Sequence, residues 1–121
     1  RLRLKKRPLW ENPYFYLLTI GDLWLRQADV TRALESYEEA EAREVDRGLV
    51  SDRYRNIASW YEEQGKLLEA QNILITYRDR DPLLFNAQLD RLARVIVAND
   101  ELAREQDSHT APTPQVRERA L

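Results

Sequence analysis

The feature that most constrains this chain is an internal repeat, in which residues 17–40 and 54–77 carry related side chains at the same spacing. The first segment contains Leu17, Ile20, Gly21, Trp24, Gln27, Ala28, Ala33, Tyr37 and Ala40, and the second contains, in the same order, Tyr54, Ile57, Ala58, Tyr61, Gln64, Gly65, Ala70, Leu74 and Tyr77. Apolar residues three and four positions apart favour helices, and two helices joined by a short turn favour an antiparallel hairpin. The repeat therefore predicts an all-α protein in which hairpins stack on one another.

Residues that begin and end helices divide the chain into five predicted helices. Asn12 and Asp29 are good N-caps, Pro13 and Pro82 suit a first helical position, and glycine suits a helix end. The helices are predicted at 13–27, from Asp29 to Gly48, from Ser51 or Asp52 to Gly65, at 67–80, and at 82–104.

The repeated pattern resembles the tetratricopeptide repeat (TPR) family. In that family a large, an aliphatic, a small and an aromatic residue line the first helix, and small, large and small residues line the second. The sequence EEQGKLLEA at 62–70 is close to the family's turn, and Pro82 closes the second repeat where the family prefers proline. The resemblance covers about residues 13–104 and implies a right-handed antiparallel helix-hairpin solenoid of two repeats, with a C-terminal capping helix.

Three positions depart from the family pattern. Gly21 and Ala58 are 37 residues apart, against about 34 in the family, which predicts that the helix ending near Gly48 is almost one turn longer than usual. Ala28 replaces the turn glycine, and a positive φ there would cost roughly 1 to 2 kcal/mol. The fifth helix repeats the first-helix pattern 35 residues after Ala58, at Ala93, without a complete partner helix.

Charge is distributed unevenly over the 121 residues, although the net charge is only −2. We predict a basic N-terminal arm at 1–9, a TPR-like helical domain at 10–104 and a flexible polar tail at 105–121. The arm contains Arg1, Arg3, Lys5, Lys6 and Arg7, and the helical domain is mildly acidic. A nucleic-acid binder would spread its positive charge over a folded face, so the pattern argues against one.

Residues for catalysis are nearly absent from the sequence. There is no cysteine, the single histidine, His109, lies in the predicted tail, and the three glycines are too far apart for a phosphate-binding loop. Neighbouring acids such as Glu62 and Glu63 point about 100° apart on a helix, as in a solvated face. We therefore predict no enzyme activity, no cofactor and no metal site.

Repeat scaffolds usually bind partners through a concave surface lined by the first helix of each pair. The register places there Phe15, Leu18, Asp22, Leu25, Arg26, Asp52, Arg55, Ser59, Glu62, Glu63, Ala87, Asp90, Arg94 and Val97.

Family members that clamp the C-terminal carboxylate of a chaperone use lysine and asparagine in this groove. Leu18, Asp22 and Ser59 stand at those places here, and an aspartate repels a carboxylate, which argues against that ligand. We expect instead an extended or helical segment with apolar anchors and a lysine or arginine facing Asp22, Glu62 or Glu63. The alternative is that these charges are merely solvated.

Five of the eleven aromatic residues gather near the N-terminus, at Trp10, Tyr14, Phe15, Tyr16 and Trp24. The helix there is apolar around nearly its whole circumference, whereas the free end of a solenoid should be polar. Trp10, Tyr14 and Tyr16 therefore predict an N-terminal interface. This interface packs on a preceding segment, docks on a partner protein, or lies at a membrane surface.

The basic arm has three interpretations: a juxtamembrane flank on an anionic membrane, an arm along an acidic partner or RNA, or a solvated tail. Because the chain contains no methionine, we expect residues to precede Arg1 in the full protein.

The sequence as a whole favours a non-catalytic adaptor or scaffold that binds a protein segment within a larger assembly, in the cytoplasm or on the cytoplasmic face of a membrane. The competing hypothesis is an obligate structural subunit of a membrane-associated complex, anchored through a preceding transmembrane or juxtamembrane segment. Arginine outnumbers lysine 16 to 3, which is typical of a GC-rich bacterial genome.

Overall fold

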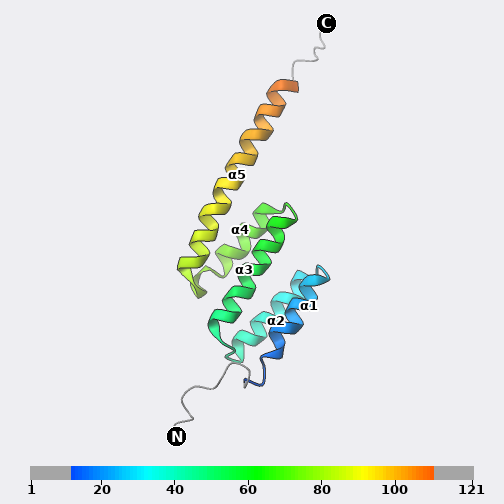
Figure 1. Ribbon diagram of the computed structural model, residues 1–121, viewed down its shortest axis with the longest axis vertical. Coiled ribbons are helices and arrows are strands. Elements are labelled where there is room, and N and C mark those ends of the chain that lie inside the picture. Colours follow the sequence, from blue (N-terminus) through cyan, green and yellow to red (C-terminus); the bar gives the residue numbers. More distant parts are fainter. Residues whose placement is uncertain (1–11, 111–121) are drawn as a thin grey trace.

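The computed structural model describes the backbone of residues 12–110 and the side chains of residues 12–105. Within that range the chain forms five α-helices and no strand (Figure 1). The helices are α1 (Tyr16–Arg26), α2 (Val30–Ala42), α3 (Arg47–Glu63), α4 (Leu67–Thr76) and α5 (Pro82–Thr110), with a short 3₁₀ turn, η3 (Arg78–Arg80), before α5. The prediction of an all-α fold with five helices is confirmed.

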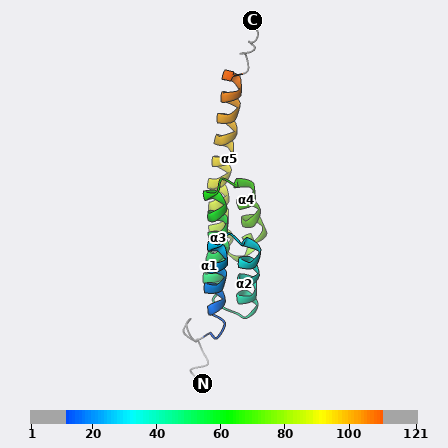
Figure 2. The same ribbon diagram turned by 90° about the vertical axis from the view of Figure 1, so that its right-hand side faces the viewer.

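The helices form two layers. Helices α1, α3 and α5 lie in one layer and α2 and α4 lie in the other, as Figure 2 shows most clearly. Helix α1 packs against α2, and α3 packs against α4, each pair running antiparallel. The first half of α5 packs against α4, and the rest projects beyond the other helices (Figure 1).

The core is built from the residues that the internal repeat brings to equivalent positions. Ala33 and Ala70 have no exposed surface, and neither do their respective neighbours Tyr37 and Leu74. Gly21 lies so close to Tyr37 that a Cβ atom at Gly21 would be 2.7 Å from Cδ1 of the tyrosine ring and even closer to Cε1. The small residues thus allow the two helices of a pair to approach closely, as the repeat predicts.

Three helices end in the same hydrogen-bonded motif. After α1, α2 and α3, the second residue past the cap donates its N–H to the carbonyl of the third-last helical residue, and the residue before it has positive φ. The positive-φ residues are Ala28 (62°), Glu44 (64°) and Gly65 (78°). Ala28 is therefore left-handed although it is not a glycine, and only one of these three ends uses glycine.

The boundary between α2 and α3 differs from the prediction. Helix α2 ends at Ala42, and α3 begins at Arg47, so Gly48 lies inside a helix and neither Ser51 nor Asp52 is a cap. Asp46 caps α3 by accepting the N–H of Leu49 at 3.2 Å. Helix α2, with 13 residues, is nevertheless longer than its counterpart α4, with 10, although it ends at Ala42 rather than near Gly48.

Other boundaries shift by a few residues. Helix α1 begins at Tyr16 after a turn, rather than at Pro13, and α4 ends at Thr76 before η3. Helix α5 begins at Pro82 as predicted but continues to Thr110, through residues that the sequence assigned to a flexible tail. Residues 1–11 and 111–121, which include Trp10, the basic arm and most of the predicted tail, lie outside the described residues.

Three tyrosines join the two hairpins. The ring of Tyr54 on α3 stacks on that of Tyr77 at a centroid distance of 3.9 Å and meets the edge of Tyr37 on α2 at 6.3 Å. Their hydroxyls donate to three carboxylates: Tyr37 to Asp22, Tyr54 to Glu41 and Tyr77 to Glu38. Burial first, and these carboxylates next, raise the pKa of each tyrosine above its usual range.

Candidate interaction surfaces

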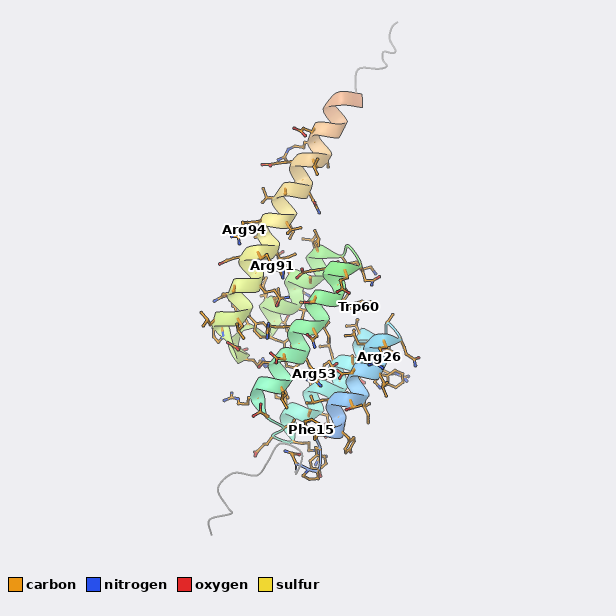
Figure 3. All side chains as sticks on the ribbon, in the orientation of Figure 1. Phe15, Arg26, Arg53, Trp60, Arg91 and Arg94 are labelled. Carbon is orange, nitrogen blue, oxygen red and sulfur yellow. The ribbon has the colours of Figure 1, made fainter. Side chains whose placement is uncertain are left out.

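The residues predicted to line a groove belong to α1, α3 and α5, or in the case of Phe15 to the turn before α1, in the layer that faces the viewer in Figures 1 and 3. Half of its charged side chains form ion pairs with described residues, namely Asp22, Asp52, Arg55 and Glu62. The Asp22 carboxylate accepts from Arg53 Nε at 3.1 Å and from Nη2 at 3.2 Å, and also from the Tyr37 hydroxyl. Asp22 therefore holds α3 against α1 and is already neutralised within the chain.

The second predicted acidic contact, Glu62, is also engaged. Its carboxylate accepts from both terminal nitrogens of Arg91 at 3.4 Å and from Gln88 Nε2 at 3.4 Å, and the same amide donates to Ser59 Oγ at 3.3 Å. Ser59 and Glu62 thus face α5 and join α3 to it.

One predicted groove residue cannot line a surface. Leu18 is 0% exposed and lies in the hydrophobic core, because α1 is rotated so that Leu18 points towards the other helices. Phe15 and Leu25 are half-buried against the same core. This corrects the expectation that Leu18 contacts a partner.

The remaining groove residues are more accessible. Arg55 pairs with Asp52 one turn earlier on α3, and its Nε is buried with no hydrogen-bond partner among the described residues. Ala87 and Val97 are exposed on α5. Four exposed residues form no ion pair with a described residue: Arg26, Glu63, Asp90 and Arg94. Figure 3 shows Arg26, Arg53, Arg91 and Arg94 contributed to this layer by α1, α3 and α5.

Apolar side chains are exposed on the outer side of α1. Tyr16 is 53%, Ile20 is 37% and Leu23 is 49% exposed, and their spacing places them on one stripe of the helix. We call these three residues the α1 face. Of the predicted N-terminal interface, Tyr16 belongs to this face, Tyr14 is half-buried, and Trp10 lies outside the described residues.

Two arginines border this region: Arg32 lies on α2, and Arg43 is the C-cap of α2. The guanidinium of Arg43 lies 4.6 Å from the ring centre of Tyr14, and that of Arg32 lies 4.7 Å from the ring centre of Trp24. Arg43 also pairs with Glu39 at 2.7 Å. Aromatic residues and arginines are the types most enriched at protein interfaces.

Among the described residues, no group of three or more histidine, aspartate or glutamate side chains is placed to hold a metal ion. No helix in the described part of the chain is long and apolar enough to cross a membrane.

Comparison with known proteins gave no match to a family model, a curated protein or a solved structure. The TPR resemblance therefore stays a prediction that rests on this chain's own residues.

Proposed function

We propose that this chain is a non-catalytic protein-interaction module of the TPR type, and that it receives a helix of a partner protein on the α1 face. The observation that carries the proposal is a difference between two positions that the internal repeat makes equivalent. Ile20 on α1 is 37% exposed, whereas its counterpart Ile57 on α3 is 0% exposed.

The reason for the difference lies in the order of the hairpins. Helix α3 is preceded by the hairpin of α1 and α2, and Tyr54 on α3 meets Tyr37 and Glu41 of α2 on that side. No described hairpin precedes α1, so the equivalent side of α1 is open (Figure 1). A helix that packed there as α2 packs on α3 would bury the exposed stripe.

The shape and chemistry of the α1 face suit an amphipathic helix. Ridges of side chains spaced by three and four residues pack into the grooves of another helix. Exposed large apolar residues that lie together and are bordered by polar groups are typical of interaction sites. The partner segment is therefore expected to present apolar residues at helical spacing.

Site-specific crosslinking tests this proposal in cells that produce the full-length protein. A photoreactive amino acid replaces Leu23 or, as the control, the 50%-exposed Ile75 on α4. We expect a crosslinked protein at Leu23 that is absent at Ile75. Equal crosslinking at both positions, or none at Leu23, would contradict the proposal.

The crosslinked protein is then purified, and its affinity is measured against variants of this chain. Leu23→Glu and Tyr16→Glu should each weaken binding by about tenfold or more, while Ile75→Glu should leave the affinity unchanged. Light scattering after size exclusion separates the two hypotheses about assembly. A monodisperse protein supports an adaptor, whereas aggregation relieved only by co-expression of the partner supports an obligate structural subunit.

A further inference from the structure

At the opposite end of the molecule, we propose that two copies of the chain pair through antiparallel α5 helices. The surface involved consists of Asp90, Ala93, Arg94, Val97, Glu101 and Arg104, all of them exposed, and we call it the α5 face. Their spacing of three and four residues places them on one side of the helix.

The first argument is the environment of Ala93. Ala93 occupies the place in the first-helix pattern that Gly21 and Ala58 hold in the first two hairpins. Gly21 and Ala58 are both buried where the two helices of a hairpin meet. Ala93 is exposed because α5 continues without a turn to Thr110, so no described helix returns along it. The surface here is shallow and open, and it is formed by α5 alone, by Ala93, Arg94, Val97, Ala98 and Glu101. Among the described residues no second helix follows α5, whereas in the other two hairpins an antiparallel helix packs at the position equivalent to Ala93.

The second argument is charge complementarity of the α5 face with itself. In an antiparallel pair with its twofold axis at Val97, a residue of one copy lies opposite a residue of the second copy when the two residue numbers add up to 194. Asp90 then lies opposite Arg104 of the second copy, and Arg94 lies next to Glu101 of the second copy. Each of these opposite-charge contacts occurs twice, and Val97 meets Val97 at the centre. A parallel pairing would instead place each charge opposite its like, which is unfavourable.

The third argument is the exposure of the projecting part of α5. Every residue from Val97 to Glu105 is exposed, although most helices in proteins gain their stability by packing an apolar face. A second copy would cover Val97 on both chains. Because the surface is narrow and polar at its edges, the dimer is expected to be weak and sensitive to salt.

Charge reversal and exchange test the proposal with the full 121-residue chain. Sedimentation velocity over a wide range of protein concentration gives the dimer dissociation constant, and circular dichroism checks the fold. Asp90→Arg and Arg104→Glu should each raise the dissociation constant by about tenfold. The double variant Asp90→Arg, Arg104→Glu should return it close to the original value. Glu35→Arg, on the exposed side of α2, is the matched control and should have no effect.

A disulfide provides an independent test because the chain contains no cysteine. Under mild oxidation, Val97→Cys should form a covalent dimer much faster than Glu35→Cys. A chain that stays monomeric at the highest concentration, a double variant that fails to restore pairing, or equal crosslinking of the two cysteine variants would each overturn the proposal.

Discussion

At the scale of single residues, the helix ends show where this chain departs from the best local choice. Ala28 and Glu44 adopt positive φ in the same hydrogen-bonded motif that Gly65 completes without steric cost. A side chain in the left-handed region costs roughly 1 to 2 kcal/mol, because its Cβ crowds the backbone. The motif forms nevertheless, because the helices on either side of each turn pack against their neighbours and require the chain to change direction there.

Replacing Ala28 by glycine should therefore stabilise the protein. Relief of the left-handed strain is partly offset by the greater freedom of glycine in the unfolded chain, which leaves a net gain of about 0.5 to 1 kcal/mol. Urea denaturation measures the change. The reciprocal variant, Gly65→Ala, should lose a similar amount, and equal stability of both variants and the parent would contradict this account.

Gly21 has a different role from the turn glycine, because it provides space beside a buried ring. Gly21→Ala gains about 1 kcal/mol of helix propensity but forces the new methyl group against the buried ring of Tyr37. We expect a net loss of about 1 to 2 kcal/mol in the free energy of unfolding.

Gly48→Ala is the control for Gly21→Ala, because Gly48 is also helical but exposed. Its new methyl group would meet only the Asp46 carboxylate, at 3.3 Å, and because this side chain can shift, the variant should raise the free energy of unfolding by up to about 0.5 to 1 kcal/mol. If both alanine variants were stabilised, the close approach of α1 and α2 at Gly21 would not matter for stability.

At the scale of elements, the connection between hairpins depends on polar groups as much as on apolar contact. Arg80 in η3 reaches α2, where its Nε and Nη2 donate to Glu41 at 3.0 and 3.1 Å, and its guanidinium lies 5.1 Å from the ring centre of Tyr77. Glu41 also accepts from Tyr54. One carboxylate thus joins three elements.

This arrangement predicts a dependence of stability on acid. The hydrogen bonds from Arg80, followed by that from Tyr54, hold the pKa of Glu41 below its usual 4.5 despite partial burial. A lowered folded-state pKa stabilises the protein above the unfolded-state value, and this contribution is lost as pH falls through the folded-state pKa.

Glu41→Gln should therefore cost roughly 1 kcal/mol at neutral pH, and the difference from the parent should shrink as the pH falls below about 4.5. Urea denaturation across this range gives the comparison, with Glu35→Gln as an exposed control. A difference that is independent of pH would show that the ionised form of Glu41 is not stabilised in the folded state.

At the scale of the whole molecule, packing decreases from the centre towards both ends. Tyr54, Ile57 and Ala58 of α3 are completely buried, whereas α1 has an open outer face and α5 projects beyond its neighbours. Local stability follows burial and contact density. The two open surfaces are therefore also those where binding changes stability most.

Hydrogen exchange should reveal this gradient in dilute solution. Amides of α3 should be the best protected. Amides of α5 should exchange faster beyond Val97 than between Phe85 and Leu92, because the side chains of these two residues are buried. Mass spectrometry of peptides along α5 measures the difference. Uniform protection along α5 in a dilute monomeric sample would contradict it.

Much of this architecture could be predicted from local sequence. The spacing of apolar residues predicted helices, and Asp29 and Pro82 marked helix starts that the structure confirms. The turn between α2 and α3 was missed, because Arg43, Glu44 and Asp46 are common in helices while the only glycine nearby, Gly48, lies inside α3. Val45, which is buried, and the Asp46 cap determine that boundary.

The sequence by itself determined that the chain is helical and which small residues permit close packing, because both depend on spacing along one helix. Only the tertiary structure decided which charges remain available to a partner. Arg53 neutralises Asp22, and Arg91 neutralises Glu62, across helices that are far apart in sequence. The same holds for Leu18, whose burial depends on the rotation of α1. A helical period gives the relative directions of side chains on one helix, but their neighbours are set by how separate helices pack.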